Sequence, residues 1–221
     1  MGLLDIIGPV MIGPSSSHTA GACRIALLAR HLLGEKPLKA EFGLHGSFAK
    51  TGAGHGTHLA LVAGVLGFKP DDPRLKESLR YAQEEGLEVA FKDVELGEVH
   101  PNTVRIALEG EKERVVVTGS SLGGGVVRVF DLEGFEVRIT GQAPTLVVKN
   151  VDTPGVVARV ARVIADDEVN IAYLTVSRKK RGAEAMMSIE LDRALSKPAL
   201  DYLAYLSYIL WVRMLPPVME G

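Results

Sequence analysis

The chain has 221 residues, of which 47% are hydrophobic and 24% charged, and its formal net charge is −2. These proportions are ordinary for a globular protein, and the small charge provides no field that would attract nucleic acid or an anionic membrane. The longest apolar stretch near the C-terminus, residues 202–212, is shorter than the ~20 residues of a membrane span. The first residues carry no positively charged leader. We therefore expect a cytoplasmic protein with no nucleic-acid partner and no membrane partner.

Cys23 is the only cysteine in the sequence. A single thiol excludes an internal disulfide, and it also excludes a zinc or iron–sulfur site built from this chain's own thiolates. Small and apolar residues surround Cys23 on both sides. We interpret it as a packed core thiol.

The first two thirds of the chain alternate helical patterns with strand patterns. A short apolar element is expected over residues 3–11, followed by helices over 19–33, 59–67 and 71–85. Strands are expected over residues 38–44, 88–93, 103–108, 114–118, 126–130 and 135–140, with a hairpin joining the third and fourth. Helices bracketed by antiparallel strands indicate an α+β domain.

The sequence changes character near residue 143, which we take as the boundary between domains 1–143 and 144–221. A β-branched run over 145–150 leads into a helix whose buried face we assign to Val156, Val160, Val163 and Ile164. Strands over 169–177 and 185–191 follow, and a final helix is expected over 198–213. The basic run 178–181 lies at a hairpin tip without aromatic residues, so it indicates a solvated turn.

The most unusual stretch is Gly13-Pro14-Ser15-Ser16-Ser17-His18-Thr19. A serine here can be an ordinary N-cap of the following helix. The same hydroxyls, together with the unpaired N–H groups of a helix start, can also form a cradle for a carboxylate or a phosphate. One cap needs one hydroxyl, whereas this segment offers four and a histidine, and the two interpretations are compatible.

A second unusual stretch, residues 46–58, combines alternating glycines with two histidines. The dinucleotide fingerprint would need glycine where Thr57 stands, so the glycines more simply allow tight turns that present His55 at the surface. Histidine is the natural general base at neutral pH. His55 and His58 have a spacing that zinc sites use, but the acidic ligand of such motifs is missing.

A third cluster, Gly123-Gly124-Gly125, follows two serines. Alone it is typical of a bend between strands. Three such turns in one domain suggest a shared pocket.

In order and spacing, these three motifs resemble the iron–sulfur-dependent L-serine dehydratases, specifically the beta subunit of the two-subunit form. The resemblance covers about the first 140 residues. It implies deamination of L-serine to pyruvate and ammonia, with a 4Fe-4S cluster held by a cysteine-rich alpha subunit and acting as Lewis acid. It implies a fold like the intervening domain of phosphoglycerate dehydrogenase.

The resemblance also assigns roles to individual residues. His55 matches the histidine proposed as the base that takes the α-proton. The residues that match the substrate-binding positions are Ser15, Ser16, Ser17, His18, Thr19, Thr51, Thr57 and Gly124. No metal ligand is expected from this chain.

The second domain resembles an ACT domain, a ferredoxin-like β-α-β-β-α-β module that binds amino-acid effectors. The resemblance rests on residues 150–156 and on Asn170-Ile171, and it implies effector contacts from Asn150, Asp152 and Asn170. Serine-binding members have His-x-Asn-x-Pro-Gly, where this chain has Asn150 and Asp152. ACT modules commonly pair, so a homodimer is expected. An aromatic stripe at residues 202, 205, 208 and 211 is expected on the final helix, where it can serve the contact between paired modules, although packing inside the domain is the more common use of such a stripe.

Two functions compete on these features. One is an ammonia-lyase subunit, active with its cluster-bearing partner; the other is a stand-alone amino-acid-binding regulatory protein. A general base at His55 distinguishes them, because an effector site has no need of one. A hydrolase using His18 and a serine nucleophile ranks last, since no acidic partner or oxyanion-hole motif is evident.

Overall fold

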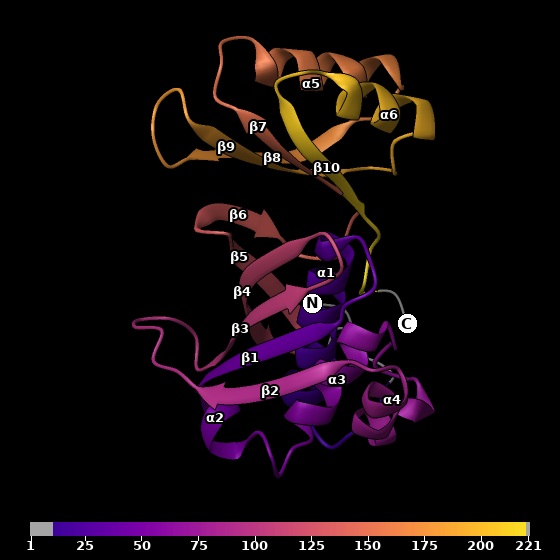
Figure 1. The fold of residues 1–221 in the computed structure, drawn as a ribbon, viewed down its shortest axis with the longest axis vertical. Helices are drawn as coiled ribbons and strands as arrows, with labels where there is room; N and C mark the ends of the chain where they lie inside the picture. Colours follow the sequence, from indigo (N-terminus) through magenta and orange to yellow (C-terminus); the bar gives the residue numbers. More distant parts are fainter. Residues whose placement is uncertain (1–10, 220–221) are drawn as a thin grey trace. The chain divides into compact units, whose positions relative to one another are not determined.

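The computed structural model describes residues 11–219. The apolar element expected over residues 3–11 therefore lies almost wholly outside the described residues. The chain divides into two compact units, one formed by residues up to 133 together with those from 218 on, the other by residues 134–217 (Figure 1).

The first unit is an α+β structure. In chain order it contains a π-helical segment η2 (Ser16–Gly21), α1 (Ala22–Leu33), β1 (Lys39–Gly46), α2 (Ser47–Thr51), α3 (Thr57–Leu66), the 3-10 helix η3 (Pro73–Glu77), α4 (Ser78–Glu84), β2 (Glu88–Asp93), β3 (Asn102–Glu109), β4 (Arg114–Gly123) and β5 (Val126–Leu132). Within this unit the strand order is β2-β1-β3-β4-β5. The pair β1–β2 is parallel and the other pairs are antiparallel.

Helices α1 and α3 pack on each other and cover one face of this sheet. Gly64 allows their close approach, because a Cβ there would lie 2.3 Å from the carbonyl oxygen of Cys23. The strands alternate inward apolar residues with outward polar ones, as Phe42 and Ile106 show on β1 and β3. Cys23 is fully buried and donates its thiol hydrogen to the Phe68 carbonyl at 3.2 Å, which confirms it as a core thiol.

The second unit contains β6 (Phe135–Ile139), β7 (Thr145–Val151), α5 (Val156–Asp166), β8 (Ile171–Arg178), β9 (Glu184–Leu191), α6 (Lys197–Tyr205) and β10 (Ile209–Leu215). Its four-stranded antiparallel sheet has the order β10-β7-β9-β8, with α5 and α6 on one face (Figure 1). The face predicted for α5, from Val156 to Ile164, is the buried one. From β7 onward the order β-α-β-β-α-β confirms the expected ferredoxin-like module.

Two expected helices are wrong in extent. The final helix ends at Tyr205, and residues 209–215 form β10 paired with β7. Tyr208 and Trp211 are therefore not on a helical stripe with Tyr202 and Tyr205. The reason is pairing with a distant strand. The Tyr208 carbonyl accepts the N–H of Val151, and β10 hydrogen-bonds to an edge of β7 whose backbone groups would otherwise have no strand partner. The polar helix expected over 71–85 is a 3-10 turn followed by the short α4.

Among residues 11–219, no helix is both long enough and apolar enough to cross a membrane.

Candidate functional site

The serine-rich segment begins a helix, and Ser15 is its N-cap. The Ser15 hydroxyl accepts the His18 N–H at 3.2 Å, and the Ser15 carbonyl accepts the Thr19 N–H at 2.8 Å. The turns that follow are π-helical before α1 continues. Gly13 permits the tight entry, because a Cβ there would lie 2.4 Å from the Thr19 hydroxyl. The capping interpretation is confirmed for Ser15.

A second short helix, α2, brings more hydroxyls to the same place. It begins after Gly46, whose φ is +56°, and a Cβ at Gly46 would lie 2.6 Å from the Pro101 carbonyl oxygen. From α2, Thr51 lies 3.1 Å and Ser47 3.3 Å from His18 Nε2. The two hydroxyls lie 3.2 Å from each other. The side chains of Ser15, His18, Ser47, Thr51 and His55 are called the hydroxyl–histidine cluster below.

The hydrogen bonds of Thr51 fix the proton on His18. Thr51 donates its only hydroxyl hydrogen to the Ser47 carbonyl at 2.9 Å. It can then only accept from His18, so His18 Nε2 carries the hydrogen and Nδ1 is free to accept. Ser15 Oγ lies 3.5 Å from that Nδ1. Burial, followed by the neighbouring His55, lowers the pKa of His18, which keeps its ring neutral at pH 7.

His55 is exposed and is oriented from two sides. Its Nδ1 lies 3.1 Å from the Thr51 carbonyl, which can only accept, so Nδ1 carries the hydrogen. Its own carbonyl accepts from the Thr19 hydroxyl at 3.3 Å. The rings of His55 and His18 lie 4.9 Å apart, centroid to centroid, at an angle of 39°. With its hydrogen on Nδ1, the neutral form of His55 has Nε2 as the ring atom that can accept a proton, which is the arrangement a general base needs.

Some of the predicted site residues contact one another in the structure, whereas others are only neighbours of these residues along the chain. Ser15, His18, Thr19, Thr51 and His55 are linked by the contacts above. Ser16 and Ser17 are half-buried, and within residues 11–219 their hydroxyls have no hydrogen-bond partner.

Thr57 and Gly124 lie further from these contacts. The Thr57 hydroxyl is fully buried and has no partner in the described part of the chain. Gly124 is exposed, with φ of +59°. The turn that contains it follows Ser121, which packs against Gly21 at the end of η2: a Cβ on Gly21 would lie 2.0 Å from Ser121 Oγ.

Sequence reasoning did not single out Ser47, although it lies inside the second motif. The available signal was its position four residues before Thr51, which places both hydroxyls on one side of a helical turn. Phe48, between them, packs edge-on against the His18 ring at 5.2 Å.

The described residues do not fit the role of a metal or cluster holder. Among residues 11–219 no group of three or more His, Cys, Asp or Glu side chains is arranged to hold a metal ion. Burial raises the pKa of the Cys23 thiol, and its hydrogen is held by a carbonyl. His58 packs against Phe91 at 4.4 Å, whereas His55 contacts His18. The two histidines thus have different surroundings.

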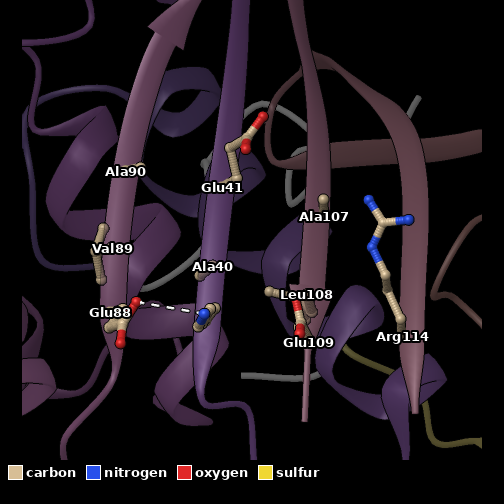
Figure 2. A pocket seen from close by; sticks show the side chains of 10 residues that line it. Ala40, Glu41, Glu88, Val89, Ala90, Ala107, Leu108, Glu109 and Arg114 are labelled. Carbon is tan, nitrogen blue, oxygen red and sulfur yellow. Dashed lines mark ion pairs between the residues drawn. The ribbon is translucent and has the colours of Figure 1, made fainter.

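A hollow lies on the sheet of the first unit, away from the hydroxyl–histidine cluster, with a volume of about 240 Å³ (Figure 2). It is lined by Lys39, Ala40, Glu41, Glu88, Val89, Ala90, Ala107, Leu108, Glu109 and Arg114. Lys39 and Glu88 form a solvent-exposed ion pair at 3.8 Å. Its lining includes no histidine, hydroxyl or thiol. The hydroxyl–histidine cluster, which contains two histidines, is therefore the better candidate for a site that transfers protons at neutral pH.

Comparison with known families matches residues 3–85 to the serine dehydratase beta chain and residues 144–201 to the ACT domain. The chain is 42% identical over 210 residues to the probable L-serine dehydratase beta chain of Bacillus subtilis (strain 168), which covers 95% of this chain and 96% of that protein. It is 40% identical over 197 residues to the L-serine dehydratase beta chain of Peptoniphilus asaccharolyticus, with coverages of 87% and 88%. This chain belongs to the serine dehydratase beta chain family.

The beta chain is also related to a second family. It is 26% identical over 134 residues to the D-3-phosphoglycerate dehydrogenase of Bacillus subtilis (strain 168), covering 61% of this chain and 26% of that protein. The expected relationship to phosphoglycerate dehydrogenase is confirmed in sequence.

In the ACT domain of this beta chain, the three expected effector residues have different surroundings. The Asp152 carboxylate accepts from Arg178 at 2.9 Å and from the Gly182 N–H at 3.0 Å, and the latter bond is the main cause that lowers its pKa. Asn150 is buried and donates to the Val151 carbonyl at 2.8 Å, while its Oδ1 has no partner among the described residues. Asn170 is exposed.

Proposed function

We propose that this chain is the beta subunit of an L-serine dehydratase, a carbon–nitrogen lyase that converts L-serine to pyruvate and ammonia. Family membership supports the reaction class. One observation in the structure supports the chemistry most directly: the Thr51 carbonyl holds His55 through Nδ1, which leaves Nε2 as the ring atom that can accept a proton beside a second histidine and a group of hydroxyls. A site that only binds an effector has no use for a base so oriented.

In this proposal each part of the cluster has a task. Ser16 and Ser17, whose hydroxyls are unpaired in the described structure, bind the polar groups of serine together with Thr57 and Gly124. Ser15 and Thr19 hold the helix start and the His55 loop in place. Neutral His18 bridges the two hydroxyl-bearing segments through Thr51. His55 takes the α-proton on Nε2.

The family's 4Fe-4S cluster is, in our proposal, held by a cysteine-rich alpha subunit. Among residues 11–219 no three or more His, Cys, Asp or Glu side chains are grouped to hold a metal ion, and Cys23 is buried with its thiol hydrogen bonded to a carbonyl. The beta chain supplies the base and part of the serine pocket.

The C-terminal module is proposed to bind an amino-acid effector at Asn150, Asp152 and Asn170 and to support a homodimer. We place the functional boundary between the dehydratase domain and this module near residue 143. A stand-alone regulatory protein is not favoured, because relatives matched over nearly their whole length are named dehydratase beta chains.

The decisive test compares His55→Gln with His58→Gln in complexes prepared anaerobically with the cluster-bearing partner. General-base removal costs roughly 10²–10⁴-fold in rate. We expect His55→Gln to lower kcat for serine-dependent pyruvate formation by this order while serine still binds. His58→Gln is the matched control, because His58 faces Phe91 outside the cluster. Unchanged turnover in His55→Gln would refute the assignment.

A further inference from the structure

Arg24, on the first turn of α1, is buried and has no acidic partner among residues 11–219. It is 3% exposed, and it is the only arginine among the buried side chains of residues 11–219. Fully buried arginines are rare unless they are paired. Here the partners of Arg24 are two backbone carbonyls: Nη1 donates to Gly125 at 2.8 Å and Nη2 to Met219 at 3.2 Å. Its Nε has no partner in the described structure.

The first carbonyl belongs to a turn that local sequence does not fix. Gly123, Gly124 and Gly125 have φ values of +102°, +59° and +79°. Glycine adopts such angles freely and loses much conformational entropy when it is ordered. Contacts from outside the turn must therefore hold it, and the bond from Arg24 is one of them.

The second carbonyl belongs to the last described residue. After β10 ends at Leu215, Pro216 and Pro217 lead the chain back to the first unit, where Val218 is buried. The φ angles of the two prolines are fixed, so this segment has little freedom. One guanidinium thus bonds both Met219 and the glycine turn.

We infer that Arg24 is a positioning residue through which the C-terminal segment Val218–Met219 fixes the Gly123–Gly125 turn. Docking of this segment orders the guanidinium, and the guanidinium in turn fixes the Gly125 carbonyl. The kinetic consequence rests on the proposed function: since Gly124 is assigned to the serine pocket, releasing the segment weakens serine binding and leaves the proton transfer at His55 intact.

A double-mutant cycle in the full chain tests the coupling, with Arg24→Gln and a deletion of residues 218–221 as the two changes. The readout is backbone hydrogen exchange of residues 121–127, which is independent of catalysis. We expect each change alone to raise exchange there about tenfold, and the two together to do no more than either alone. Arg24→Lys, which can satisfy one carbonyl, should fall between.

Arg30 provides the matched control. It lies on the same helix and donates to the Val65 carbonyl at 2.6 Å, away from the C-terminal segment. Arg30→Gln and the deletion should have independent effects. If Arg24→Gln does not fold, the deletion alone still decides, because unchanged exchange at the turn would overturn the inference. So would multiplicative effects of Arg24→Gln and the deletion.

Kinetics in the complex with the partner separate this inference from the proposed function. The deletion should raise KM for serine about tenfold, equivalent to ~1.4 kcal/mol, with kcat little changed. Faster exchange at the turn without a change in KM would leave the role of Arg24 standing and contradict the placement of Gly124 in the serine pocket.

Discussion

Gly21→Ala probes the contact that places the serine-rich segment on the sheet. A Cβ at Gly21 would lie 2.0 Å from Ser121 Oγ and 2.7 Å from Ser121 Cβ, and both residues are buried. Overpacking of this kind costs about 1–3 kcal/mol. The backbone at Gly21 is helical, and alanine has a higher helix propensity than glycine, so this gain offsets up to ~1 kcal/mol of the lost unfolding free energy. We expect a net loss of about 1–2 kcal/mol in unfolding free energy.

The partner substitutions make this prediction specific. Ser121→Ala removes only the nearer atom, whereas Ser121→Gly removes both. Ser121 Oγ is buried without a partner among the described residues, so Ser121→Ala alone should be neutral or stabilising by about 1 kcal/mol. In urea unfolding followed by circular dichroism, Ser121→Gly should rescue Gly21→Ala more fully than Ser121→Ala does.

Two results would refute this reasoning. One is a Gly21→Ala variant as stable as the parent; the other is a cycle in which Gly21→Ala and Ser121→Gly simply add. Either result would mean that Gly21, at the end of the serine-rich segment, does not pack closely against Ser121.

The remaining predictions concern titratable groups. Burial raises the pKa of Cys23, so the folded protein should react with a thiol reagent only at the rate of its unfolding, and fast labelling of the native state would contradict its burial. The pKa of His18 is lowered on folding, so its stabilising contribution is fully present above the unfolded-state pKa of about 6.5 and is lost as the pH falls from there through the lower folded-state pKa. His18→Asn should flatten the fall in urea stability between pH 7 and 5 by at most ~1.4 kcal/mol per pH unit. An unchanged slope would mean that His18 does not titrate in this range, with His31 and His58 remaining as contributors.

Most strands and helices could be predicted because their patterns are local. The stripe on α5 has helical spacing, and the β3–β4 hairpin alternates around a short polar turn. The strand β10 could not be found this way. Residues 206–212 form a short apolar run that suits a helix or a strand equally, and pairing with β7 decides between them.

In the candidate site, too, features set by local sequence could be predicted, and features set by contacts between distant segments could not. The residue types alone, and their clustering along the chain, point to the serine-rich and glycine–histidine segments. Sequence could not show that the first turns are π-helical, or that Ser47 joins the cluster, because both depend on how α2 lies beside η2. Nor could it give the ring orientation of His55, which the Thr51 carbonyl fixes.

The late position of β10 and of residues 218–219 has a consequence for biosynthesis. Strand β7 pairs with β10, some sixty residues later in translation, and Arg24 bonds Met219, which is translated 195 residues after it. Neither unit can reach its final form while these last residues remain inside the ribosome. A nascent chain stalled before residue 209 would expose an edge of β7 and leave the Arg24 guanidinium lacking one of its two carbonyls. Such truncated products are expected to be substrates for chaperones and proteases.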